Sequence, residues 1–445
     1  MRLWWLMLPA ALFGQGAGQV QFRDLGPMRP DRRPAISCRE LLSLTGFEFS
    51  VVSARVVAGT SDAPEHCRVR LFTQPELNIE VNLPTDWNGR LYMFGNGGWA
   101  GEAFDTSGRA TNRARGLKAG FATASTDTGH SAAAEPGASF ALNRQKLLDY
   151  GFRSLHLTAE AAKTMARAYY GMAPAKSYYE GCSQGGRQGL TLAQRFPNDF
   201  DGIVAGAPAL NQTGTHLSRA YWMRAMNENP FPASKLPLLA ERVYAFCDAK
   251  DGLKDGLIDD PRRCGFKASR DLPRCVAGSD RPDCFTSNEI ASLERIYSDV
   301  VSKGERFFPG WPVGAEVIGP NGKSGWLGQE VVDADGRSAW AFYGHNFLEF
   351  VVPATRTRPD AADAKRLFSR VDVANDPPDV EDAHDIIDAN DPNLSAFRKH
   401  GGKLLLYYGW ADPQLNPMMG VEYYEQVVRA MGPTTGDFAR LFMVP

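Results

Sequence analysis

The sequence lacks two features that would assign it to a nucleic-acid-binding or membrane-embedded class. Its charges nearly balance, with 49 Lys and Arg against 51 Asp and Glu, so neither nucleic acid nor an anionic membrane is expected as the main partner. Beyond the N-terminus, no apolar run approaches the ~20 residues that a membrane-spanning helix needs. A hydrophobic fraction of 43% in 445 residues still suffices for one large domain or two ordinary ones.

Cysteine is also scarce, and the number of cysteines is odd. The seven are Cys38, Cys67, Cys182, Cys247, Cys264, Cys275 and Cys284. At least one of them therefore has no partner within this sequence, and six cysteines alone allow 15 pairings.

The N-terminus has the pattern of a secretory signal peptide. Met1 and Arg2 give a positive start, residues 3–13 are apolar, and residues 14–18 are mostly small. This pattern predicts a signal peptide over residues 1–18 and a mature, exported chain from about Gln19. Export would place the protein where disulfide bonds persist.

The strongest motif is Gly181-Cys182-Ser183-Gln184-Gly185, which fits the G-x-S-x-G nucleophile elbow. A short strand is predicted before it, over 175–180, and a helix after it, over 186–196. In that context the turn raises the Ser183 hydroxyl toward the helix N-terminus, where backbone N–H groups stabilise an oxyanion. The alternative is a glycine-rich packing turn with an inert serine.

Strands and helices alternate on both sides of this motif, which predicts a mostly parallel α/β sheet. The expected strands and helix of the first part cover residues 68–83, 91–94, 120–125, 155–170 (helix) and 200–205. The pattern disappears over 210–389 and returns with a helix at 393–400, a strand at 403–408, a helix at 419–431 and a strand at 438–444. We therefore predict a domain inserted at 210–389 into a domain formed by 19–209 and 390–445.

Asp412 is the candidate acid that orients a catalytic base. It follows the strand at 403–408, and α/β-hydrolases carry their triad in the order Ser, Asp, His. The alternative is a turn residue before Pro413. The seven histidines, at positions 66, 130, 156, 216, 345, 384 and 400, all precede Asp412. Since the base belongs after the last strand, we expect the sequence to stop just short of its histidine.

Four motifs together resemble the tannase/feruloyl esterase family, which includes mono(2-hydroxyethyl) terephthalate hydrolases. They are Cys182-Ser183-x-Gly-Gly, the Gly-Asn-Gly-Gly-Trp-Ala-Gly loop at 95–101, Asp-Thr-Gly-His at 127–130 and Gly-Trp-Ala-Asp-Pro at 409–413. The resemblance covers nearly all of the mature chain. It implies an α/β-hydrolase fold with a lid, and hydrolysis of esters of aromatic acids such as gallate, ferulate or terephthalate through an acyl-enzyme.

The resemblance also implies roles for particular residues. The oxyanion donors would be the backbone N–H of Gln184 and that of Gly97 or Gly98. The implied disulfides are Cys38–Cys67, Cys247–Cys264 and Cys275–Cys284. In the family, the cysteine before the serine pairs with a cysteine just after the histidine, so the partner of Cys182 is expected beyond Pro445.

An acidic segment in the predicted insert, residues 247–260, is a candidate cation site. Its acids are separated by glycines that let the chain curl, and calcium takes six to eight oxygen ligands. The spacing is not that of an EF-hand, and a solvated acidic turn is the alternative. The resemblance implies calcium, held by the side chains of Asp248, Asp251 and Asp255 and by the carbonyls of Leu253 and Leu257. Its role would be to hold the lid, and no organic cofactor is expected.

Aromatic residues of the insert are candidates for stacking on a substrate ring, with ordinary core packing as the alternative and the more common role for any single one. They are Trp326, Trp340, Phe342, Phe347 and Phe350. Two rival functions remain at this point: a secreted non-catalytic binder of aromatic esters, and an acyltransferase in which an alcohol replaces water. The residues fix neither the particular ester nor the oligomeric state.

Overall fold

The computed structural model describes residues 33–46, 48–316, 325–326, 338–352 and 368–445. The predicted signal peptide, residues 1–18, lies outside these ranges.

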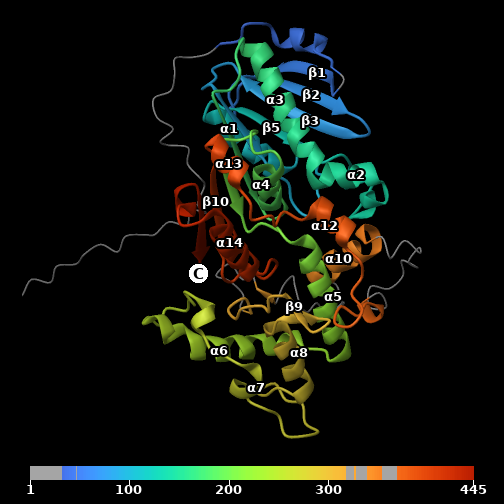
Figure 1. The fold of residues 1–445 in the computed structure, drawn as a ribbon, viewed down its shortest axis with the longest axis vertical. Coiled ribbons are helices and arrows are strands. Elements are labelled where there is room, and N and C mark those ends of the chain that lie inside the picture. Colours follow the sequence, from blue (N-terminus) through green and yellow to red (C-terminus); the bar gives the residue numbers. More distant parts are fainter. Residues whose placement is uncertain (1–32, 47, 317–324, 327–337, 353–367) are drawn as a thin grey trace, which may run out of the picture.

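A nine-stranded sheet forms the upper half of the molecule in Figure 1. Its order is β1-β2-β3-β5-β4-β6-β7-β10-β11. The first three strands pair antiparallel, as do β3 and β5, and every later pairing is parallel. The strands are β1 Ser50–Val57, β2 His66–Thr73, β3 Leu77–Pro84, β4 Arg90–Phe94, β5 Ala122–Thr126, β6 Lys176–Cys182, β7 Gly202–Gly206, β10 Lys403–Gly409 and β11 Ala439–Val444.

The single strand expected over 68–83 is wrong, because the chain there forms two strands. β2 and β3 make a hairpin whose register runs from His66 opposite Pro84 to Thr73 opposite Leu77. The turn between them contains Pro75, which has no N–H to donate to a ladder. Both strands alternate between the two sheet faces, so their combined pattern resembles one long strand.

Helices connect the parallel strands and pack along them. α3 contacts β3 and β5, α4 contacts β6 and β7, and α14 contacts β10 and β11. The predicted end of α3 is confirmed, since Gly171 caps it with φ 74°. The helices are α1 Ser107–Lys118, α2 Arg144–Leu148, α3 Ser154–Tyr170, α4 Gln184–Arg195, α13 Ser395–His400 and α14 Pro417–Met431.

Between β7 and β10 the chain leaves the sheet and forms a largely helical region below it (Figure 1). Residues of both regions, among them Tyr150, Tyr408, Trp222 and Trp340, belong to one continuous buried cluster. The region therefore packs on the sheet through a shared core. Its elements are α5 Gln212–Glu228, α6 Leu236–Cys247, α7 Ala268–Asp271, α8 Ser287–Tyr297, β8 Val300–Ser302, β9 Glu305–Phe308, α10 Ala339–Asn346 and α12 Glu381–Ile387.

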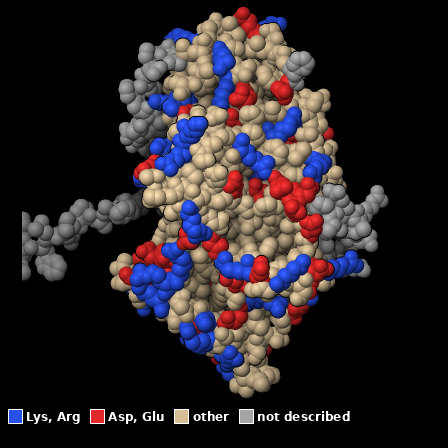
Figure 2. Space-filling model, in the orientation of Figure 1, with Lys and Arg blue, Asp and Glu red and all other residues tan. Residues whose placement is uncertain are grey.

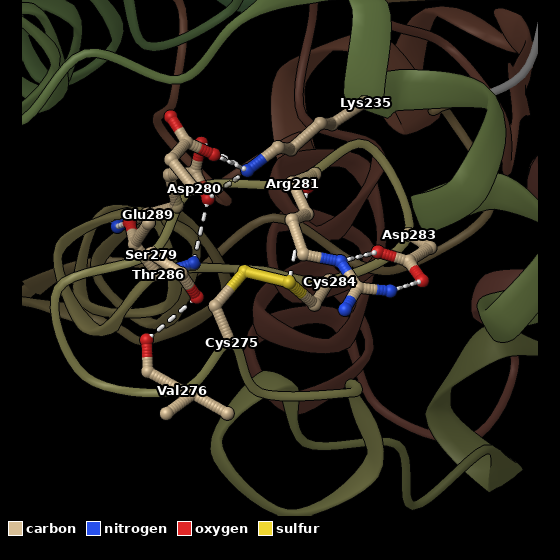
Figure 3. The surroundings of a disulfide bond; sticks show 10 residues. All are labelled: Lys235, Cys275, Val276, Ser279, Asp280, Arg281, Asp283, Cys284, Thr286 and Glu289. Carbon is tan, nitrogen blue, oxygen red and sulfur yellow. Dashed lines mark hydrogen bonds and ion pairs between the residues drawn. A yellow bond between two sulfur atoms is a disulfide. The ribbon is translucent and has the colours of Figure 1, made fainter.

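Three disulfides are present, Cys38–Cys67, Cys247–Cys264 and Cys275–Cys284, which are the pairs that the family resemblance implies. Beside the last of them, the buried amine of Lys235 donates to Asp280 at 2.6 Å and to Glu289 at 2.8 and 2.9 Å (Figure 3). The Glu289 carboxylate also accepts the N–H of Thr286 and so caps α8. The two ion pairs of Lys235 fasten the disulfide loop, through Asp280, to the start of α8, through Glu289.

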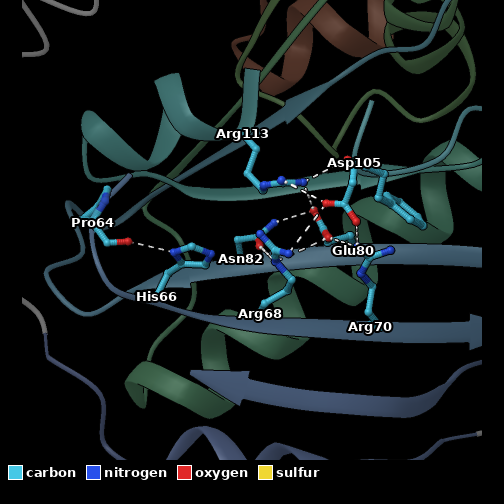
Figure 4. Close-up of polar contacts among 9 residues, drawn as sticks. Pro64, His66, Arg68, Arg70, Glu80, Asn82, Asp105 and Arg113 are labelled. Carbon is cyan, nitrogen blue, oxygen red and sulfur yellow. Dashed lines mark hydrogen bonds and ion pairs between the residues drawn. The ribbon is translucent and has the colours of Figure 1, made fainter. Parts of the chain in front are cut away.

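A buried charge cluster fastens α1 to the antiparallel end of the sheet (Figure 4). The fully buried carboxylate of Glu80 on β3 lies 2.6 Å from Arg70 and 3.0 Å from Arg113. Asp105, just before α1, completes the cluster through Arg113 at 3.2 Å. Paired charges of this kind compensate for the loss of hydration that burial imposes on each group.

The outer surface carries charges of both signs, and neither sign covers the face seen in Figure 2. Among the described residues, no helix is both long and apolar enough to span a membrane.

Candidate active site

Ser183 occupies a strained turn between the end of β6 and the start of α4. Its backbone has φ 60° and ψ −119°, a left-handed region that costs a non-glycine residue free energy. The Ser183 N–H donates to the carbonyl of Gly206 at 2.9 Å, and its own carbonyl accepts from Arg187 and Ala209. The strain is therefore held in place by backbone hydrogen bonds to β7 and α4.

The glycines around Ser183 are required by close backbone contacts. A Cβ on Gly186 would lie 2.4 Å from the Gly206 carbonyl oxygen, and a Cβ on Gly181 would lie 2.5 Å from the backbone of Gly185. The Gly185 position faces the carbonyl of Asn96 at 3.1 Å. The motif thus lets α4 approach β7 and the glycine-rich loop more closely than any side chain would permit.

Ser183 and Gln184 line a narrow cavity of about 30 Å³. The cavity has aromatic walls, provided by Trp99, Tyr150 and Tyr343. This volume holds one or two water molecules, since one needs about 10–15 Å³. The space above Ser183 is therefore too narrow, in this conformation, for an aromatic ester.

The two glycines predicted as oxyanion donors lie in different places. Gly98 lines the cavity with Ser183 and Gln184, whereas Gly97 lines a neighbouring polar cavity of about 440 Å³ that also contacts Cys182. A Cβ on Gly98 would lie 3.0 Å from the Tyr343 hydroxyl. Of the two, Gly98 is the one that the structure brings to Ser183.

Gln188 on α4 fixes the glycine-rich loop at 95–101. Its side-chain oxygen accepts the Asn96 N–H at 3.0 Å and the Tyr179 hydroxyl at 3.1 Å, and its nitrogen donates to the Asn96 side chain at 3.2 Å. Sequence reasoning missed this residue. The only signal for it was a glutamine on the helix directly behind the motif.

A buried polar network supports the base of the cavity. Gln212 donates to the Tyr150 hydroxyl at 3.0 Å and to Gln184 at 2.7 Å. Gln184 also accepts from the Nε of Arg187 at 2.9 Å. Burial raises the pKa of Tyr150 to about 12, so its hydroxyl stays protonated and available as a donor. Gln212 and Arg187 were also absent from the predicted site.

Asp412 lies just beyond the end of β10, where the sequence predicts it. Its carboxylate accepts the N–H groups of Gln414 at 2.8 Å and Leu415 at 3.1 Å. Burial raises the pKa of this carboxyl group, while these two N–H groups act in the opposite direction. The indole N–H of Trp340 donates to the Pro413 carbonyl at 3.0 Å and holds the same turn.

Cys182 is the free cysteine of the chain, and its thiol is near Asp412. Burial and then the charge of Asp412 raise the pKa of the thiol. Position 182 therefore lies at the edge of the sheet where the nucleophile turn and the acid turn meet.

All seven histidines are described, and none hydrogen-bonds to Ser183 or Asp412 within the described part of the chain. Three of them pair with acids: His156 with Asp199, His345 with Glu349, and His384 with Asp388. His66 is buried and contacts the Pro64 carbonyl at 2.8 Å (Figure 4). His216 lines the cavity beside Ser183.

The aromatic residues proposed for ring stacking lie elsewhere. Trp326, Trp340 and Phe347 are fully buried in the core, Phe350 packs against that core, and Phe342 is half exposed. None of the five lines the cavity at Ser183. Trp326, Trp340 and Phe347 thus take the alternative role, core packing, because the composition of the insert does not indicate which side chains face the site.

The carboxylates of the predicted calcium loop are not gathered around a common point. The described residues contain no group of three His, Cys, Asp or Glu side chains that could hold a metal ion. Asp248 instead accepts the N–H groups of Asp255 and Gly256, and Asp251 accepts that of Leu253. Asp255 likewise accepts the N–H of Leu257. The loop curls as expected, but in this arrangement its donors do not fit a cation.

Comparison with known proteins places these features in a family. A family model described as tannase and feruloyl esterase matches residues 61–445. The mono(2-hydroxyethyl) terephthalate hydrolase of Piscinibacter sakaiensis is 30% identical, over 88% of this chain and 74% of that protein. Feruloyl esterase B of Aspergillus niger is 28% identical, over 89% of this chain and 72% of that protein.

Solved structures agree with the sequence matches. The crystal structure of feruloyl esterase B from Aspergillus oryzae superposes with a TM-score of 0.73 at 26% identity, covering 92% of this chain and 81% of that one. The sheet order, the serine turn after β6 and the acid turn after β10 are thus parts of an α/β-hydrolase fold. The chain belongs to the tannase and feruloyl esterase family and is a carboxylic-ester hydrolase.

Proposed function

We propose that this protein is an extracellular serine esterase that cleaves esters of aromatic acids, with Ser183 as its nucleophile. The observation that carries the proposal is the strained Ser183 backbone at the N-terminus of α4, facing a cavity with aromatic walls. The names of the relatives support the substrate class, since they include feruloyl esterases and a terephthalate-ester hydrolase.

In this mechanism the Ser183 oxygen attacks the ester carbonyl, the base oriented by Asp412 takes the serine proton, and that proton passes to the leaving alcohol. The backbone N–H groups of Gln184 and Gly98 stabilise the negative charge on the carbonyl oxygen, a contribution worth about 10²–10³ in rate for each donor. Water then releases the acid from the acyl-enzyme. Asp412 is assigned the role of orienting a histidine base. Within the described residues, none of the seven histidines contacts Asp412 or Ser183 as that base would.

The fold around Gln188 and Gln212 supports these assignments physically. Gln188 fixes the loop that carries Gly98, and Gln212 fixes the side chain of Gln184. Both oxyanion donors would therefore be rigid before substrate arrives, and preorganised dipoles of this kind contribute most to transition-state stabilisation.

The remaining proposals concern location and the inserted region. Three disulfides and the signal-like N-terminus support export. The region at 210–389 would act as a lid, since its residues Arg219 and Tyr343 line the cavity at Ser183. Calcium at the acidic loop remains a proposal that rests on the family resemblance.

The test combines covalent labelling with product analysis. We expect the wild-type protein to react with a fluorophosphonate and to release acid from methyl ferulate, methyl gallate or mono(2-hydroxyethyl) terephthalate. Ser183→Ala should abolish labelling and lower kcat by about 10⁴- to 10⁶-fold. Ser279→Ala, at a partly exposed serine of the inserted region, is the matched control and should behave as wild type.

Other outcomes identify the two rivals. A wild-type protein that labels no more than Ser183→Ala, yet binds these esters, would be a non-catalytic binder. A protein that forms a new ester when a phenolic or sugar alcohol is added, in preference to free acid, would be an acyltransferase.

A further inference from the structure

His216 lines the cavity at the candidate nucleophile and has no role in the mechanism. It lies on α5, is 5% exposed, and lines the cavity together with Ser183. Its ring is clamped between Trp99 and Phe347, each with ring centroids 5.1 Å away. A side chain held in this way has a fixed orientation toward the cavity.

The neighbour of His216 on the same helix determines which ring nitrogen carries the proton. Arg219 Nη1 lies 3.4 Å from Nδ1 of His216. A guanidinium group can only donate, so Nδ1 must accept, and the proton of a neutral ring is then on Nε2. Burial, and next the charge of Arg219, hold the pKa of His216 well below its usual range, so the ring is neutral at pH 7.

The ring nitrogen that carries the proton is the one that Arg219 does not contact. Within the described residues, His216 makes its hydrogen bond through Nδ1 and none through Nε2. Because His216 lines the cavity and its Nδ1 is directed at Arg219, Nε2 is the ring nitrogen left to meet a ligand there. The site therefore presents an N–H donor beside an apolar wall formed by Trp99 and Tyr343.

We propose that His216 Nε2–H donates a hydrogen bond to an acceptor oxygen on the ring of the bound acyl group, which makes His216 a specificity-determining residue. This rests on the proposed function, because it assumes that an aromatic acyl group enters this cavity. A substrate without such an oxygen would leave the N–H desolvated and unpaired. Sites of this kind discriminate mainly by that penalty.

The same geometry excludes His216 as the general base of Ser183. A base needs a lone pair directed at the serine proton, and the Nδ1 lone pair of His216 is engaged by Arg219. The orientation instead suits a substrate contact. His216 is therefore assigned to the ring of the substrate and not to the reacting ester.

Two pairs of esters and two variants test the proposal. Methyl 4-methoxycinnamate and methyl 4-ethylcinnamate have nearly the same shape, but only the first has a ring oxygen, and the 3-substituted pair covers the other ring position. We expect wild type to prefer one methoxy ester over its ethyl partner by about 3- to 10-fold in kcat/KM, the value of one neutral hydrogen bond. His216→Phe should bring this ratio of kcat/KM values close to one. We expect the change to appear in KM and not in kcat.

His216→Gln restores an N–H donor and should recover part of the preference, which separates hydrogen bonding from packing. Long-range ¹H–¹⁵N NMR of the ring should place the proton on Nε2 at pH 7. The proposal is overturned if His216→Phe keeps the wild-type preference, if wild type shows none for either pair, or if the proton is on Nδ1.

Failure of the esterase function would give a different result. Binding of 4-methoxycinnamic acid and 4-ethylcinnamic acid, and of the 3-substituted acids, can be measured by fluorescence on Ser183→Ala, where no turnover is needed. If no ester is cleaved but the methoxy acid binds more tightly and His216→Phe removes the difference, the proposed reaction fails and the assignment of His216 stands. Equal binding of the acids in every variant overturns the assignment of His216 alone.

Discussion

Ser183 adopts a backbone conformation that costs free energy, and the glycines around it make that conformation possible. Strain of this kind costs about 1–3 kcal/mol and persists only where the surrounding structure enforces it. Here the enforcing contacts are the hydrogen bond from Ser183 to Gly206 and the direct approach of Gly186 to the same carbonyl. The turn geometry is thus a property of β7 as well as of the motif.

We expect Gly186→Ala to lower the free energy of unfolding by about 1–3 kcal/mol, although alanine normally stabilises a helix. The new Cβ would lie 2.4 Å from the Gly206 oxygen and 2.8 Å from Pro208, so α4 would have to move away from β7. Gly108→Ala on α1 is the control, because nothing lies within 4 Å of its Cβ. Urea unfolding of both variants makes the comparison, and equal stability would contradict the steric account.

His130 should make the protein sensitive to acid. Its ring stacks on Phe140 and is buried, and neither nitrogen forms a hydrogen bond of good geometry with a described residue, although the carbonyls of Thr128 and Trp99 lie nearby. Burial lowers the pKa of His130 to about 4 from the usual 6.5. The stability that it contributes is therefore complete above pH 6.5 and is lost as pH falls toward 4, by at most about 3 kcal/mol.

Thermal unfolding between pH 4 and 8 tests this assignment. The Tm of His130→Phe should fall less than that of wild type as pH drops below 6.5. The hydrogen bond with Asp199 raises the pKa of His156, so the stability that His156 contributes is present at low pH and lost as pH rises. His156→Phe should therefore destabilise the protein more at low pH than at high pH. Parallel pH profiles for the two variants would refute both assignments.

At the scale of elements, α4 joins parts of the chain that are far apart in sequence. The buried guanidinium of Arg187 donates to the carbonyls of Tyr150 and Gly151, in the turn before α3, and to that of Ile387, at the end of α12. One side chain on the nucleophile helix thereby ties the sheet region to the inserted region.

Arg187→Met should therefore cost roughly 3 kcal/mol or more, because several buried carbonyls lose their donor at once. Arg195→Met is the control on the same helix, since Arg195 is exposed and bonds to a single carbonyl, that of Asp385. We expect that variant to lose less than about 1 kcal/mol. If the two variants unfold at the same urea concentration, Arg187 is not the tie between the two regions.

The same elements show which parts of the fold sequence patterns can predict. Strands β4 to β7 can be predicted from their apolar runs, and helix α3 from its 3.6-residue repeat. The glycines on either side of Ser183 identify the nucleophile turn. Helix α5 was missed because it is buried on nearly all sides and so has no polar face. β1 was missed because its partly exposed residues do not alternate cleanly. Gln188 and Asn96 are 92 residues apart, and no local pattern relates them.

At the scale of the whole molecule, calcium should couple the acidic loop to overall stability. If the loop binds calcium, its carboxylates must turn from backbone N–H groups toward the ion, and calcium at 100 times its Kd would add about 2.7 kcal/mol. We expect calcium to raise the Tm of EDTA-treated wild type, and Asp248→Asn to weaken this effect. Asp259→Asn, in the same loop but outside the implied ligand set, should respond as wild type. If calcium leaves the Tm of wild type unchanged, the loop does not bind calcium in the folded protein.

The small cavity above Ser183 has a kinetic consequence. Pockets that enclose an aromatic ligand usually measure about 300–1,000 Å³, an order of magnitude more than the 30 Å³ found here. An aromatic ester therefore needs a conformation in which this cavity is wider, and its apparent Kd exceeds the intrinsic value by the inverse of the fraction of molecules in that conformation. Substitutions that loosen the contacts of Tyr343 or Arg219 would enlarge this fraction. They would speed substrate uptake without altering any group that takes part in the chemistry.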